Sequence, residues 1–200
     1  MPTTRTLVGI AAALVVLGGS TAAIAGPLDA RGATKALNCS ACHGFAGQSP
    51  STTVPILAGM SPEYFKKAIA DYAAARRPSP EMEPFAKAVL QSGVEDVAAY
   101  FAAQPRQPTT IPVDPAAAAR GKTAAAQCAL CHGPDGRGDP SKNVPDLRGQ
   151  PVGYLRNQMF LFKADRRSPA DERLKPLKAL MKTIPDATLA DLAAYFSSVR

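Results

Sequence analysis

The stretch Cys39-Ser40-Ala41-Cys42-His43 decides the fold of this chain, and its pattern recurs 89 residues later as Cys128-Ala129-Leu130-Cys131-His132. Each stretch is a C-x-x-C-H motif, the attachment signature of a c-type haem. The two thiols can form thioethers with the haem vinyl groups, and the adjacent histidine can ligate the iron. The motifs contain all four cysteines and both histidines of the chain. The sequence therefore predicts two covalently bound haem c groups, with His43 and His132 as iron ligands.

Three other uses of the cysteines explain less of this pattern. Disulfides do not require a histidine after the second cysteine, and a thioredoxin-like dithiol needs a βαβ context that the sequence lacks. A structural zinc site would join motifs 89 residues apart and would leave six potential ligands for four positions. Disulfides remain the leading alternative to haem.

The first 25 residues have the pattern of a secretory signal peptide. Arg5 is followed by an apolar run from Leu7 to Leu17 and by small residues that end in Ala23-Ile24-Ala25. The pattern predicts cleavage after Ala25 and a periplasmic mature protein. The strongly apolar run is too short to cross a hydrocarbon core, which needs about 20 residues. An uncleaved leader, with membrane association of the protein, is the alternative, because residues 8–24 are apolar or small throughout.

Positive charge is concentrated in the second half of the mature chain. Residues 26–107 have eight basic and seven acidic side chains, whereas residues 108–200 have fourteen and nine. Seven basic and three acidic residues lie between Lys163 and Lys182, which predicts docking of this half on an acidic partner surface. A solvated face without a partner is the alternative. Nucleic acid is not indicated, because no basic motif alternates with aromatic residues.

The mature sequence reads as two copies of one unit. The phrases Val54-Pro55-Ile56-Leu57-Ala58-Gly59 and Val144-Pro145-Asp146-Leu147-Arg148-Gly149 follow the two motifs, with a tyrosine five residues after each glycine. Arginine pairs lie twelve residues after Tyr64 and after Tyr154. Each half closes with an amphipathic segment that ends in Ala-Ala-Tyr-Phe. The expected helices are residues 27–37, 62–75, 94–101, 114–127, 151–164 and 189–196.

Four prolines between positions 104 and 115 predict a stiff, extended linker. The expected organisation is a first domain at 26–104, a linker at 105–115 and a second domain at 116–200. Asp114 followed by Pro115 has the pattern of an N-cap and the first position of a helix. No segment alternates like a strand, so the sequence predicts an all-α protein.

These residues resemble the dihaem cytochromes c4 and their class I relatives over the whole mature chain. The resemblance rests on the order of the C-x-x-C-H motif, a glycine-rich loop, the P-x-L-x-G phrase and a helix that begins near tyrosine and ends in basic residues. It implies two tandem class I cytochrome c-like domains that transfer electrons. It also implies that the carbonyl groups of Pro55 and Pro145 accept hydrogen bonds from His43 and His132, which would orient each imidazole.

In the first domain, Met82 is the expected sixth iron ligand. It lies 18 residues before Tyr100, which is the spacing that the resemblance implies. Histidine and methionine together give a six-coordinate iron with a raised potential, as suits an electron carrier. Met60, at a position where the family often has glutamine, is the alternative.

The second domain departs from this spacing. The residue 18 positions before Tyr195 is Leu177, which cannot ligate, and the segment after Arg167 is five residues longer than its counterpart. Met181, four residues later, is the expected ligand, although a helix would carry it roughly 6 Å further along the same face. The alternatives are Met159, a lysine such as Lys175 or Lys178, and an iron without a sixth ligand.

The function expected from these features is electron transfer between a membrane quinol-oxidising complex or a dehydrogenase and an acceptor such as a terminal oxidase. Outside the motifs, no nucleophile is paired with a base, so no enzyme activity is expected. One alternative is a dihaem subunit of a sulfur-compound or other dehydrogenase. Another, motivated by Leu177, is an open gas-binding or catalytic site at the second haem.

Overall fold

The computed structural model describes residues 30–169 and 171–200, so the leader predicted at 1–25 lies outside the described residues. In the first half, the helices are α1 (Ala33–His43), η1 (Phe45–Gly47), α2 (Pro62–Ala73), α3 (Met82–Ser92) and α4 (Val94–Ala102). In the second half, they are α5 (Pro115–Ala124), η2 (Ala125–Cys128), α6 (Ala129–His132), η3 (Pro140–Lys142), α7 (Val152–Lys163), η4 (Glu172–Leu174), α8 (Lys175–Thr183) and α9 (Asp186–Ser198). The predicted all-α fold is confirmed. Within the described ranges, extended pairing is limited to an isolated bridge between Asp139 and Val144.

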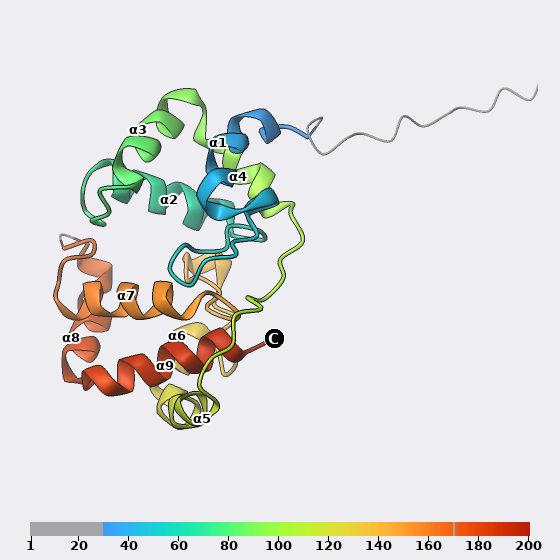
Figure 1. Cartoon of the computed structure of the whole chain (residues 1–200). Helices are drawn as coiled ribbons and strands as arrows, with labels where there is room; N and C mark the ends of the chain where they lie inside the picture. Colours follow the sequence, from blue (N-terminus) through green and yellow to red (C-terminus); the bar gives the residue numbers. More distant parts are fainter. Residues whose placement is uncertain (1–29, 170) are drawn as a thin grey trace, which may run out of the picture.

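The two halves lie one above the other in Figure 1, and the segment after α4 runs along one edge of the molecule to α5. No helix interrupts this segment between α4 and α5, as expected from its prolines. It is attached to the second half, because Thr109 is buried and its N–H donates to the carbonyl of Gly149 at 2.8 Å. At the start of α5, the Asp114 carboxylate accepts a hydrogen bond from Ala116 N at 2.9 Å, which confirms the predicted N-cap.

In each half, the terminal helix crosses the first helix at a glycine. A side chain at Gly32 would overlap the backbone carbonyl of Asp96 in α4, and one at Gly121 would overlap that of Asp191 in α9. The two backbones approach closely because these residues lack a Cβ atom. In the second half, Arg120 of α5 also bridges this crossing, because it donates two hydrogen bonds of 2.8 Å to Asp191 of α9.

The repeated P-x-L-x-G phrases hold equivalent positions in the two cores. Gly59 N donates to the carbonyl of Phe101 at 2.8 Å, and Gly149 N donates to that of Phe196 at 2.8 Å. Both phenylalanines are buried, with exposed fractions of 0% and 2%. The duplicated sequence therefore forms two similar helical cores, each closed by its Tyr-Phe pair.

Two features of the fold differ from the sequence expectation. The first helix was expected at 27–37, but α1 begins at Ala33 and continues through the whole first motif to His43. Helices α3 and α8 were not predicted, because proline occurs within or next to each and obscures the apolar period. Proline is compatible with the first turn of a helix, and Pro176 of α8 occupies that turn.

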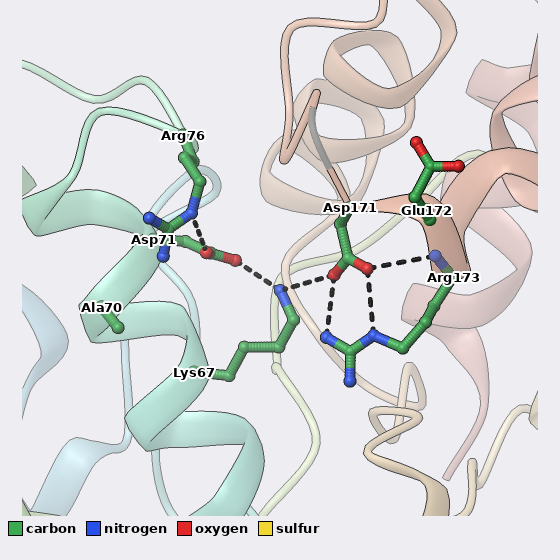
Figure 2. A pocket seen from close by; sticks show the side chains of 7 residues that line it. All are labelled: Lys67, Ala70, Asp71, Arg76, Asp171, Glu172 and Arg173. Atoms are coloured by element: carbon green, nitrogen blue, oxygen red, sulfur yellow. Dashed lines mark hydrogen bonds and ion pairs between the residues drawn. The ribbon is translucent and has the colours of Figure 1, made fainter.

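A chain of ion pairs joins α2 of the first half to the segment before α8 of the second (Figure 2). Lys67 lies between two carboxylates, at 2.5 Å from Asp71 in its own helix and 3.7 Å from Asp171 in the other half. Arg76 and Arg173 pair with the outer sides of these carboxylates at 2.9 and 3.0 Å. The three cations and two carboxylates of this cluster alternate across the interface, so each carboxylate lies between two cations.

Candidate haem sites and the interface between them

The second motif opens into a cavity of about 740 Å³, within the range of volumes that hold cofactors. Its walls include the side chains of Cys128, Cys131 and His132. Polar side chains and some residues of the first half, such as Met60 and Tyr64, also line it. Its apolar wall comes from several helices of the second half: Leu155, Met159, Phe162, Leu177, Leu180, Met181, Ile184, Leu192 and Phe196. A large apolar cavity with two thiols and an imidazole in its wall fits a covalently attached haem.

The orientation of His132 follows from a backbone contact. Its Nδ1 lies 3.0 Å from the carbonyl oxygen of Pro145. Because a carbonyl only accepts hydrogen bonds, Nδ1 carries the proton and Nε2 keeps a free electron pair. Burial lowers the pKa of His132, so the imidazole is neutral as a ligand must be.

The first motif has the same arrangement. His43 is 5% exposed, and its Nδ1 donates to the carbonyl of Pro55 at 2.8 Å. Burial lowers the pKa of His43 as well, although the hydrogen bond to Pro55 opposes this shift. Burial also raises the pKa of Cys39 in the first motif and of Cys128 in the second. All four thiols are free in the structure.

Met82 is the first residue of α3 and packs against the core of the first half. Cys39 and Met60 pack against the same core. The side chains of Met82 and of Cys39 in the first motif therefore pack against the same hydrophobic core. Met60 additionally lines the cavity of the second half, so it lies at the boundary between the two halves.

In the second half, Leu177 and Met181 lie one turn apart on α8, and both line the cavity. Met159 of α7 lines it too. The lysine alternatives are engaged elsewhere. Lys178 donates to the carbonyl of Ser168 at 2.7 Å and pairs with Asp165 at 2.8 Å, while Lys175 pairs with Glu172 at 2.5 Å. Among the candidate ligands, the structure thus brings the sulfur atoms to the cavity rather than the amines.

Between the halves lies a buried polar group that we call the interface cluster: Tyr64, Arg77, Tyr154, Gln158 and Arg167. Arg77 of the first half donates to the hydroxyl oxygen of Tyr154 at 2.7 Å and to Gln158 Oε1 at 2.9 Å. Arg167 of the second half donates to the hydroxyl oxygen of Tyr64 at 2.7 Å and to Gln158 Oε1 at 2.9 Å. Each arginine therefore binds the tyrosine of the opposite half, and Gln158 accepts from both.

The two tyrosines of the cluster differ in acidity. Burial would raise the pKa of Tyr64, but the guanidinium groups of Arg167 and Arg77 outweigh it and lower the pKa to about 8. Burial raises the pKa of Tyr154 to about 12. The side chain of Arg77 is 2% exposed and stacks on Tyr72, with 4.6 Å between the guanidinium carbon and the ring centroid.

The spacing of Tyr64 and Tyr154 from their arginine pairs is visible in the sequence. Their rings are buried. Their hydroxyl groups, however, serve the contact between the halves. The equal spacing in both copies was the available signal, and it could not show that each arginine crosses to the other copy.

Comparison with known proteins places this architecture among the c-type cytochromes. The cytochrome c family model matches residues 118–200. Cytochrome c4 from Pseudomonas aeruginosa is 30% identical over 193 residues, which cover 93% of this chain and 96% of that protein. The chain belongs to the cytochrome c4 family, a family of electron-transfer proteins that bind haem covalently.

Two further relatives agree with this family. The crystal structure of reduced recombinant cytochrome c4 from Pseudomonas stutzeri superposes with a TM-score of 0.75 at 26% identity and covers 84% of this chain and 96% of that one. A protein from Stutzerimonas stutzeri called thiosulfate dehydrogenase electron acceptor is 28% identical, over 82% of this chain and 80% of its own length. The two tandem cytochrome c-like domains are therefore confirmed as the fold. In the part of the chain that the structure describes, no helix could span a membrane.

Proposed function

We propose that this protein is a periplasmic dihaem electron carrier. One haem is attached to Cys39 and Cys42 in a first domain at 26–104, and the other to Cys128 and Cys131 in a second domain at 116–200. The linker at 105–115 joins them, and residues 1–25 direct export. Each haem supplies one-electron redox chemistry at its iron.

In this proposal, the iron ligands are His43 with Met82 and His132 with Met181. The observation that carries it is the cavity of the second half, whose wall combines Cys128, Cys131 and His132 with Met181. Pro55 and Pro145 support it, because each carbonyl holds its histidine with Nε2 free. The protein residues thus attach the cofactor, orient its ligands and exclude water.

The partners are redox proteins that donate to and accept from this carrier. A membrane quinol-oxidising complex or a dehydrogenase would donate, and an acceptor such as a terminal oxidase would receive the electrons. The second half supplies exposed cations next to its cavity, among them Lys142 and Lys175, whose side chains are 77% and 70% exposed. Such a surface favours encounter with an acidic partner.

A second candidate is service as the cytochrome partner of a sulfur-compound dehydrogenase. The relative named as a thiosulfate dehydrogenase electron acceptor favours it. A third is an open second iron that binds gases or a substrate, favoured by Leu177 in the cavity wall. Co-purification with a dehydrogenase would support the second candidate, and stoichiometric binding of carbon monoxide by the ferrous protein would support the third.

The experiment that tests the main proposal is an intact-mass measurement combined with optical and EPR spectra of the purified holoprotein. The mass should exceed that of the polypeptide from residue 26 by two haem groups that survive acid-acetone extraction. The spectra should report low-spin iron at both sites. A mass with oxidised thiols and no haem would reject the proposal.

A further inference from the structure

Gln150 of the second half reaches into the loop of the first half that carries Pro55. Ile56 N donates to Gln150 Oε1 at 2.9 Å, and Gln150 Nε2 donates to the carbonyl of Ile56 at 2.8 Å. Gln150 is 4% exposed and Ile56 is 0% exposed, so water does not compete for these bonds. The amide oxygen and the amide nitrogen of Gln150 thus both hydrogen-bond to the backbone of Ile56 in the first half.

The same loop is held at a second point. Gly153 N and Tyr154 N, in the first turn of α7, donate to the carbonyl of Thr52 at 2.9 and 3.2 Å. The loop from Thr52 to Ile56 is therefore bound at both ends by the second half. Its conformation depends on the contact between the halves as well as on its own sequence.

The contact of Gln150 leads directly to His43. The carbonyl of Pro55 and the N–H of Ile56 are the two ends of one peptide group, which is planar and rigid. Gln150 holds the N–H end, and His43 Nδ1 donates to the carbonyl end at 2.8 Å. Fixing one end fixes the direction of the other. A carbonyl whose peptide N–H is also hydrogen-bonded is polarised and becomes a better acceptor.

Among the described residues, no side chain of the first half holds the Pro145–Asp146 peptide in this way, although Arg106 pairs with the Asp146 carboxylate at 3.4 Å. The residue equivalent to Gln150 is Met60, whose thioether cannot hold a peptide in this way. A backbone bridge within the second half supports the loop before Pro145. Asp139 N donates to the carbonyl of Val144 at 3.0 Å, and Val144 N donates to the carbonyl of Asp139 at 2.9 Å. The support of the two histidines is therefore unequal.

We propose that Gln150 is a positioning residue for His43, acting from the second half through the Pro55–Ile56 peptide. The inference rests on the proposed function, in which His43 ligates the first iron. A hydrogen bond from Nδ1 to a well-placed carbonyl makes the imidazole a stronger donor to iron and favours the ferric state. Gln150 thereby lowers the potential of the first haem. It also lines the cavity of the second half, but there it holds no peptide next to an iron ligand, so its effect on the second haem is the smaller one.

The test uses the full-length holoprotein with Gln150→Met, a near-isosteric change to the residue type that the first half has at this position. Gln150→Leu is the second variant. Redox titration should show a larger upward shift in the potential of the first haem than in that of the second. NMR of the ferric protein should show displaced methyl resonances for the first haem, each haem being assigned through contacts with its own cysteines.

Ser168→Ala is the matched control. Ser168 Oγ donates to Asp71 at 3.0 Å across the same interface, but Asp71 lies on α2 rather than in the loop with Pro55. This variant should leave both potentials in place. Equal shifts in the two haems of Gln150→Met, or a shift in neither, would overturn the inference. Because haem content is measured first, a failure of the proposed function would appear as missing haem in the wild-type protein and is thus distinguishable.

Discussion

Arg77 of the first half donates a hydrogen bond of 2.7 Å to the hydroxyl oxygen of Tyr154 in the second half. The equivalent pair, Arg167 and Tyr64, makes the same contact in the opposite direction at the same distance. A surface that pairs with its own copy in this way is typical of two-fold symmetric dimers. Here both copies lie in one chain, so the contact forms at any protein concentration.

Loss of Arg77 should weaken the contact between the halves substantially. Arg77→Met removes the charge-assisted hydrogen bonds to Tyr154 and Gln158, each worth roughly 1.5–3 kcal/mol. We expect the free energy of unfolding in urea to fall by about 3 kcal/mol. Arg76→Met is the control, because Arg76 is 45% exposed and its pair with Asp71 is worth about 1 kcal/mol or less. Equal losses in both variants would contradict this account of the interface cluster.

The interface should also weaken in acid through Asp71. Burial raises the pKa of this carboxyl, but hydrogen bonds from Lys67, Ser168 and Arg76 outweigh the burial and lower it. A carboxyl whose folded pKa is lowered contributes stability above its unfolded pKa of about 4, and that contribution is lost as the pH falls through the folded pKa. The free energy of unfolding should therefore decrease below pH 4.

The measurement is a urea titration at pH 7 and at pH 3, on the wild-type protein and on Asp71→Asn. The variant should be less stable at pH 7, by about 2 kcal/mol for its lost charged hydrogen bonds, and should show a smaller difference between the two pH values. Glu172→Gln, which removes an exposed ion pair with Lys175 within the second half, serves as the control. The same pH dependence in Asp71→Asn and wild type would show that another group is responsible.

The basic surface of the second half should control encounter with an acidic partner. Reversal of Lys142, Lys175 and Lys182 to glutamate should slow electron transfer at low salt, and the difference should shrink as salt screens the charges. Lys178 is unsuitable for this experiment because it is 5% exposed and paired with Asp165. Reversal of Arg31, Lys66 and Lys87 in the first half is the matched control. Equal slowing by both sets would indicate a general charge effect rather than a docking surface.

The sequence predicted the features that occur in both halves of the chain. Both motifs, both P-x-L-x-G phrases and the terminal helices occur in the same order in the two halves, so the comparison of one copy with the other located them. The contacts of Pro55 and Pro145 with the histidines are present as the family resemblance implied.

The sequence could not show which residues of the two halves contact each other. A repeat unit carries no information about which of its residues face a second unit, so Arg77 and Gln150 could not be assigned to the interface. The sequence also did not show that Lys178 is buried. Lys178 and its acceptor Ser168 lie in the longer segment after Arg167, and its partner Asp165 lies just before that segment, where the first half has Ala75.

The two irons should differ in the strength of their sixth ligand. Met82 begins α3 beside the first core and lies 18 residues before Tyr100. On α8, the residue 18 positions before Tyr195 is Leu177, and Met181 lines the cavity one turn later. A thioether displaced along the helix should bind weakly, so the second site should be the first to lose its iron–thioether absorption band on warming.

Replacement of each methionine separates the two sites. Met82→Ala should convert a stable low-spin iron to high spin and lower its potential, because the thioether favours ferrous iron. Met181→Ala should change only the weaker component of the band, and Leu177→Ala, the matched control on the same face of α8, should leave the spin state of both irons unchanged. The contrary result would be two low-spin signals of equal thermal stability, one lost in Met82→Ala and the other in Met181→Ala. In that case the displacement along α8 would have no effect on ligation, and the two haems would be equivalent.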